Sequence, residues 1–188
     1  MRVRRAALAA ALVGALAASA MPVAAADPVR ADPQGGCARS ESASLPAERF
    51  RDNGDGTITD IASKLMWMRC SMGQRWQSGA CVGAAGVASW PEAQRHADQM
   101  NLDGGASFSD WRLPSVRELA TITARECFRP RTNVAIFPGT APAAYWSATP
   151  RAGEASGERV FALGFGAQGV FAARKDERHH LRLVRSGP

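Results

Sequence analysis

Four cysteines constrain the fold of this chain more than any other feature of its sequence. They are Cys37, Cys70, Cys81 and Cys127. Cys70 and Cys81 bracket SMGQRWQSGA, which we expect to be a short loop because it contains glycine and serine. We therefore expect these two cysteines to pair, which leaves Cys37 to pair with Cys127. No C-x-x-C occurs, and no histidine stands at ligand spacing from a cysteine, which disfavours a zinc site. Two disulfides require an oxidising compartment.

The N-terminus indicates such a compartment. MRVRR is positively charged, residues 6–20 are apolar, and Ala24 and Ala26 have the spacing that signal peptidase recognises. We expect residues 1–26 to be a signal peptide, and the mature protein to be exported to the periplasm or the extracellular space. The alternative is a membrane anchor, for which the apolar run is short. We expect no stable membrane insertion after removal of the signal.

The charge of the remaining chain is modest. Removal of Arg2, Arg4 and Arg5 lowers the formal net charge from +6 to +3. A domain with so small a net charge does not indicate a nucleic-acid partner. The 162 residues that remain of the 188 can form one sizeable core.

Residues 51–67, RDNGDGTITDIASKLMW, admit two interpretations. A calcium loop of the EF-hand type needs acidic ligands at positions one, three and five. Counting from Asp52 places Gly54 at position three, and counting from Asn53 places Thr57 at position five, so neither register fits. NGDG tolerates positive φ and TITDI alternates as a strand does, which predicts a β-hairpin with the aspartates in its turn.

Two helices are predicted after the hairpin. The pairs Ser89 with Glu92 and Ser115 with Glu118 each form an S-x-x-E capping box, which marks a helix start. The expected apolar faces consist of Trp90, Ala93, Ala97 and Met100 in the first helix, and of Val116, Leu119, Ala120 and Ile122 in the second.

The other segments complete an α+β fold. Residues 27–48 are expected to be a flexible N-terminal arm, and residues 125–144 a long irregular loop. KLMWM, AYWSAT, RVFALGF, GVFAAR and HHLRLVR are predicted strands, and the last alternates leucine with arginine. A hairpin, two helices, a long loop and late antiparallel strands, in that order, indicate the α+β class.

Several motifs occur here in a recurring order: DNGDGTITD with LMW, C…GQRW…C, DWRLPSVREL, YWSAT and LRLVR. In these the chain resembles the Lcl C-terminal domain family over roughly residues 49–186, and we assign residues 49–188 to that domain. The resemblance implies an exported bacterial protein with a C-type lectin-like fold. The adhesin that gives the family its name binds sulfated polysaccharides and forms trimers. This chain has no collagen-like repeat, so its oligomeric state stays open.

The sequence indicates binding rather than catalysis. It has no G-x-S-x-G, no H-E-x-x-H and no glycine-rich phosphate loop after a strand, and oxidised cysteines leave no thiolate nucleophile. RLPSVREL also resembles a corner of formylglycine-generating enzymes, but their reactive cysteine pair has no counterpart here. We expect no catalytic residue, metal or cofactor. The three histidines are expected to be exposed or to act as caps.

The candidate ligand-binding residues are cationic or aromatic. Loop arginines can bind sulfate or carboxylate through paired N–H donors, and the candidates are Arg125, Arg129, Arg131 and Arg151. Trp76 lies between polar residues and could stack on a sugar, whereas the other tryptophans are expected in the core. Arg112 and Glu118 are expected to form a buried structural pair. A solvated basic face is the alternative for the arginines.

Two functions follow. The first is an exported, adhesin-like binding domain that recognises an anionic polysaccharide or surface polymer. The second is a periplasmic or envelope accessory protein whose partner is another protein.

Overall fold

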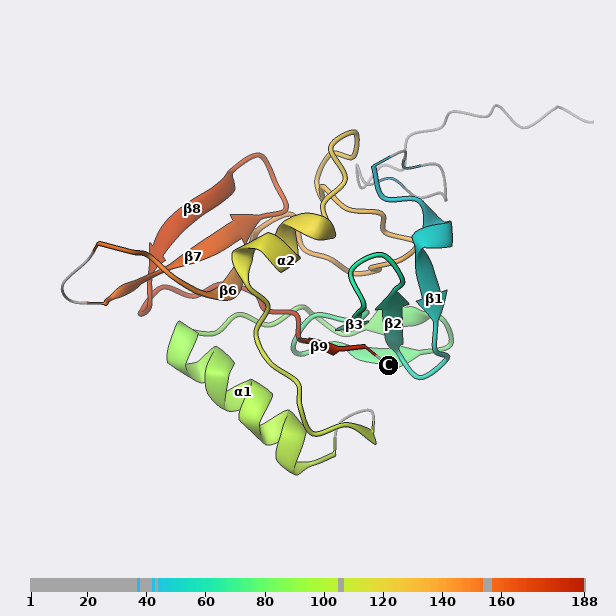
Figure 1. Cartoon of the computed structure of the whole chain (residues 1–188), viewed down its shortest axis with the longest axis horizontal. Helices are drawn as coiled ribbons and strands as arrows, with labels where there is room; N and C mark the ends of the chain where they lie inside the picture. The colour runs from blue at the N-terminus through green and yellow to red at the C-terminus, as the bar shows by residue number, and fades with distance from the viewer. Residues whose placement is uncertain (1–36, 38–41, 43, 105–106, 154–156, 188) are drawn as a thin grey trace, which may run out of the picture. The chain divides into compact units, whose positions relative to one another are not determined.

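The computed structural model describes residues 37 and 42 and the ranges 44–104, 107–153 and 157–187. The predicted signal peptide lies outside these residues, as does most of the predicted arm. The described residues form two α-helices and three antiparallel sheets (Figure 1). The predicted α+β class is therefore confirmed, while the likeness to C-type lectins stays a prediction.

The first sheet joins the two ends of the described domain. Its strands are β1 (Phe50–Asp52), β2 (Thr57–Asp60), β3 (Leu65–Met68) and β9 (Val184–Ser186), in the order β1-β2-β3-β9. The predicted hairpin is β1–β2. Its aspartates accept hydrogen bonds from the turn itself, because Gly54 N donates to Asp52 Oδ1 and Thr57 N donates to Asp55 Oδ1, both at 2.9 Å.

The other two sheets are a hairpin and a three-stranded meander. The hairpin consists of β4 (Arg75–Gln77) and β5 (Ala80–Val82), and the meander of β6 (Ala144–Pro150), β7 (Arg159–Gly164) and β8 (Gly169–Arg174). The meander strands were predicted, whereas β4 and β5 were expected to be loop. Ser78 and Gly79 both have positive φ, which is the conformation of a tight two-residue hairpin turn.

Both predicted helices begin where their capping boxes indicate. In α1 (Trp90–Leu102), Ser89 N donates to Glu92 Oε2 at 2.8 Å, and in α2 (Val116–Thr121), Ser115 N donates to Glu118 Oε2 at 2.6 Å. The face expected for α1 is confirmed by buried Ala93 and Ala97. The face expected for α2 is only partly correct. Leu119 and Ile122 are buried, but Val116 is half-buried and Ala120 is exposed.

Apolar side chains collect in two core clusters. Leu119, Phe137 and Trp67 belong to the first, and Trp111 and Trp146 belong to the second, beneath α1 and the meander. These three tryptophans are buried, as predicted, whereas Trp90, also expected in the core, is only partly buried against the second cluster.

The C-terminal segment differs from the prediction. Residues 179–185 were expected to form one strand, but only β9 forms, and His179 and His180 make isolated bridges to Ala88 and Tyr145. Arg182 is 1% exposed, as deeply buried as its leucine neighbours. The alternation of leucine with arginine therefore does not separate core from solvent here.

Both predicted disulfides are present, with Cα–Cα distances of 5.1 Å for Cys37–Cys127 and 5.4 Å for Cys70–Cys81. The end of the predicted arm is held by more than Cys37. Leu45 is 0% exposed in the first core cluster, and a 3₁₀ turn, η1 (Ala47–Arg49), leads into β1. Across the described residues, neither helix has the length and apolar character needed to cross a membrane.

Candidate functional site

Three of the four candidate arginines lie on one short loop, residues 124–131, which we call the arginine loop. Ala124 N donates to Arg131 O at 2.9 Å and closes it, while Arg131 N donates to Phe165 O at 2.7 Å. Cys127, near the middle of the loop, is bonded to Cys37. The loop is thus held at its base and at its centre.

Glu126, the one acidic residue of this loop, accepts hydrogen bonds from two serines of the N-terminal arm. Glu126 Oε1 accepts from Ser42 Oγ at 2.6 Å and from Ser44 N at 2.9 Å, and Oε2 accepts from Ser44 Oγ at 2.5 Å. These hydrogen bonds, that from Ser42 foremost, lower the pKa of Glu126 to about 2. The carboxylate is therefore ionised, and its oxygens accept from the two serines. Among the residues that the structure describes, no ion pair joins it to an arginine.

Besides Glu126, the exposed side chains of the arginine loop are cationic and aromatic. Arg125 and Arg129 are exposed, Arg131 is half-buried, and Phe128 between them is 59% exposed. Phe128 was not among the predicted site residues. Its signal in the sequence is an aromatic residue within RECFRPR, where every neighbour but the cysteine and the proline is charged.

Arg151 lies elsewhere. It follows β6 in the turn toward β7, where its N–H donates to Arg159 O at 3.1 Å. The end of β6 and the start of β7 lie at the left of the view, away from the loop that follows α2 (Figure 1). The structure thus brings three of the four predicted arginines together and leaves the fourth apart.

Trp76 is not the open stacking platform that the sequence suggested. It lies on β4 opposite Cys81 and is half-buried. The guanidinium of Arg69 stands 4.2 Å from its ring centroid, so a cation already covers part of the ring. The rest of the ring borders a cavity.

This cavity has a volume of about 380 Å³ and lies between β3, β4 and α1. We call it the methionine cavity, because its lining includes three thioether side chains besides Trp76 and His96: Met68, Met72 and Met100. Leu181 and Leu183 of the C-terminal segment also line it.

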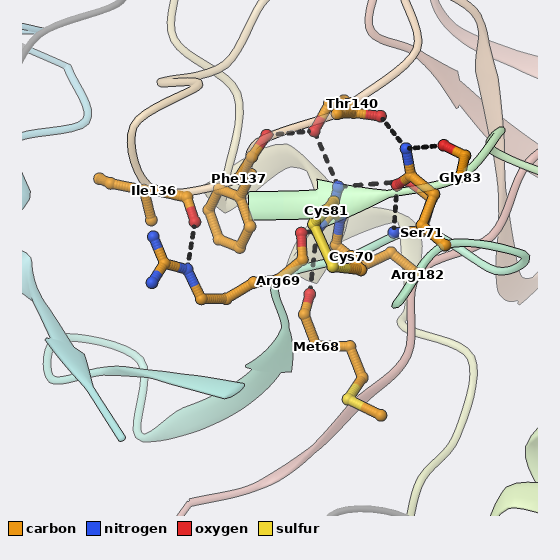
Figure 2. The surroundings of a disulfide bond; sticks show 12 residues. Met68, Arg69, Cys70, Ser71, Cys81, Gly83, Ile136, Phe137, Thr140 and Arg182 are labelled. Carbon is orange, nitrogen blue, oxygen red and sulfur yellow. Dashed lines mark hydrogen bonds between the residues drawn. A yellow bond between two sulfur atoms is a disulfide. The ribbon is translucent and has the colours of Figure 1, made fainter. Parts of the chain in front are cut away.

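Two buried arginines hold the end of β3, which supplies Met68 to the lining of this cavity (Figure 2). Arg182 donates to the carbonyls of Met68 and Arg69, and to Thr140 Oγ1 at 2.7 Å. Arg69 Nε donates to Ile136 O at 3.0 Å. Figure 2 shows the Met68 carbonyl facing Arg182 while its side chain extends the other way. The two guanidinium groups therefore fix the end of β3 against the long loop.

Comparison with known families identifies the domain that carries these features. A model of the Lcl C-terminal domain matches residues 56–185, which is more than half of the chain. The chain belongs to this family. A search of curated proteins found no match.

The Lcl C-terminal domain of this chain contains the predicted Arg112–Glu118 pair. Arg112 Nη2 and Nη1 donate to the two carboxylate oxygens of Glu118 at 2.7 and 2.8 Å. The side chains are 45% and 21% exposed, so the expectation of a buried pair is wrong in that respect. Hydrogen bonding to Arg112 lowers the pKa of Glu118 despite partial burial. The pair braces the start of α2.

The histidines of this Lcl C-terminal domain are half-buried, which corrects the expectation of exposed or capping residues. His96 lines the methionine cavity, and burial lowers its pKa. His180 Nδ1 lies 2.8 Å from Gly86 O, and burial lowers its pKa also. His179 packs on Trp146 with ring centroids 4.5 Å apart. Within the described ranges, no three His, Cys, Asp or Glu side chains form a metal-binding group.

Proposed function

We propose that this protein is an exported, non-catalytic binding domain that recognises an anionic glycan or surface polymer through the arginine loop. The observation that carries the proposal is the division of charges on that loop. Glu126, although exposed, accepts hydrogen bonds from Ser42 and Ser44, while Arg125, Arg129 and the ring of Phe128 are exposed beside it.

The chemistry of these groups suits a sulfated or carboxylated sugar. A guanidinium donates two parallel hydrogen bonds to such an anion. An exposed aromatic ring offers a rigid apolar surface to the ring beside it. The disulfide at Cys127 and the closing hydrogen bond between Ala124 and Arg131 hold the loop in one shape before binding, which reduces the entropy lost on association.

Elution from a sulfated-polysaccharide column tests this proposal. We expect retention of the oxidised protein to fall sharply as salt rises, because contacts between exposed charges are screened. The double variant Arg129→Ala/Arg131→Ala should elute at clearly lower salt. Arg151→Ala serves as the control, because Arg151 is the one candidate arginine that lies outside the loop. Its retention should be close to that of the unmodified protein. Elution of the unmodified protein near zero salt, or no effect of the double variant, would reject the proposal.

An envelope protein is the second candidate partner. The exposed ring of Phe128 favours it, because aromatic and arginine side chains are enriched in protein interfaces. Recovery of one defined polypeptide with the protein from a native envelope fraction, abolished by Phe128→Ala and unaffected by added sulfated polysaccharide, would support this alternative over the glycan.

A further inference from the structure

Three methionines gather around one cavity, which plays no part in the glycan-binding proposal. The chain has six methionines, of which Met1 and Met21 fall in the predicted signal peptide. Met66 is packed in the second core cluster with 5% exposure. The other three, Met68, Met72 and Met100, all line the methionine cavity.

We propose that this cavity binds a soft monovalent metal ion of the Cu(I) or Ag(I) class, held by the three methionine thioethers and the imidazole of His96. Thioether sulfur is a soft ligand and selects such ions over Mg²⁺, Ca²⁺ and Zn²⁺, while imidazole suits copper. All four cysteines are oxidised, so thioethers are the soft donors that remain.

The backbone positions these donors on two walls of the cavity. On one wall, Met68 N donates to Leu183 O and Met72 N donates to Leu181 O, both at 3.1 Å. The other wall is α1, on which His96 and Met100 stand four residues apart and therefore share one face. The buried guanidinium of Arg182 fixes the first wall by donating to the Met68 carbonyl at 2.9 Å.

Core filling is the ordinary role of methionine, whose flexible side chain occupies irregular gaps. Met66 has that role here. The three cavity methionines also pack against the second core cluster, but each is half-buried and borders a volume of about 380 Å³ that they leave unfilled. The same flexibility allows their sulfur atoms to converge on an ion, since a methionine side chain has three rotatable bonds.

Titration of the oxidised protein with Ag(I), and with Cu(I) buffered by a chromogenic chelator under anaerobic conditions, tests the proposal. We expect one ion per chain. With methionine methyl groups labelled for NMR, the signals of Met68, Met72 and Met100 should shift and that of Met66 should stay in place. Absence of saturable binding, equal affinity for Zn(II), or a shift of the Met66 signal alone would overturn it.

Leucine substitutions provide matched variants, because they remove sulfur at nearly constant volume. Met68→Leu, Met72→Leu and Met100→Leu should each weaken Ag(I) binding roughly tenfold or more, since loss of even an outer partner of a metal site costs about that much. Met66→Leu, the control, should leave the affinity unchanged. An equal loss in Met66→Leu would contradict the assignment. All four variants should keep their retention on sulfated polysaccharide, so this proposal and the glycan proposal fail independently.

Discussion

At the scale of single residues, Arg182 is a buried cation that binds backbone and side-chain oxygens of other parts of the domain. Its guanidinium is buried and donates to backbone carbonyls of Met68 and Arg69 and to the hydroxyl of Thr140. Burial lowers the pKa of Arg182. Its donors bind two chain segments, residues 68–69 and Thr140, rather than one carboxylate, so its loss would leave acceptors in both segments without a donor.

We expect Arg182→Met to lower the free energy of unfolding by about 2 kcal/mol or more, because each buried polar group left unsatisfied costs about 1–3 kcal/mol. Urea denaturation measures this loss. Arg178→Met removes an arginine whose side chain is 57% exposed, and the change should stay within about 0.5 kcal/mol. An Arg182→Met protein as stable as the unmodified one would show that the carbonyls find water instead.

Glu126 should give the stability of the domain a pH dependence. Its pKa is about 2 in the folded state, below its ordinary value of 4.5. The stabilisation is therefore complete above about pH 4.5 and is lost as the pH falls toward 2. Glu126→Gln should destabilise the domain near neutral pH by no more than about 1 kcal/mol, because the carboxylate is exposed.

The measurement is the free energy of unfolding of the two proteins at several pH values. Their difference should shrink to nothing near pH 2. Glu48→Gln, an exposed carboxylate in η1, is the control and should show no comparable trend. If Glu126→Gln remained less stable than the unmodified protein at pH 2, the loss of stability would come from the shape of the side chain rather than from its charge.

At the scale of elements, Gly56 of the β1–β2 turn lies against Trp76 of the β4–β5 hairpin. Gly54 and Gly56 have φ of 84° and 88°, where a Cβ is strained. A Cβ at Gly56 would also lie 2.6 Å from Trp76 Cβ, whereas none at Gly54 meets an atom within 4 Å.

Gly54→Ala should therefore cost about 1 kcal/mol of stability from backbone strain alone. Gly56→Ala should cost about 1–3 kcal/mol more, because the new methyl group overpacks against Trp76. Urea denaturation midpoints of the two variants measure this difference, and that of Gly56→Ala should be the lower. Equal midpoints would mean that the β4–β5 hairpin moves aside freely.

Elements with local signals were predictable, and elements decided by distant contacts were not. The capping boxes at Ser89 and Ser115 placed both helix starts, because a cap is made by residues three apart. The β4–β5 hairpin was missed because its alternation covers only three residues on each strand. The C-terminal segment was predicted as one strand, since nothing local reveals that Arg182 turns inward to Met68 and Thr140.

At the scale of the whole molecule, the same distinction applies to the candidate site. The sequence indicated arginines in a long loop, and Arg125, Arg129 and Arg131 do share one. That Glu126 binds Ser42 and Ser44 depends on contacts across more than 80 residues. That Arg151 lies elsewhere depends on where the turn between β6 and β7 is placed in the fold. The methionine cavity needs β3, α1 and the C-terminal segment to meet, so no local pattern predicts it.

The two disulfides should contribute unequally to the stability of the whole domain. Cys37–Cys127 spans 90 residues and Cys70–Cys81 spans 11. A longer closed loop restricts the unfolded chain more, so the chain-entropy model gives about 4.5 kcal/mol for the first bridge and about 3 kcal/mol for the second. Urea denaturation of the Cys37→Ser/Cys127→Ser and Cys70→Ser/Cys81→Ser proteins measures both.

The long bridge also holds the arginine loop, whereas the short bridge lies at the methionine cavity. Loss of Cys37–Cys127 should therefore weaken retention on sulfated polysaccharide at a temperature where the protein is still folded, because the freed loop must be ordered on binding. Loss of Cys70–Cys81 should leave retention unchanged under the same conditions. If the two double variants were retained equally, the arginine loop would not depend on its tether, and the pre-organised shape could not be what favours binding.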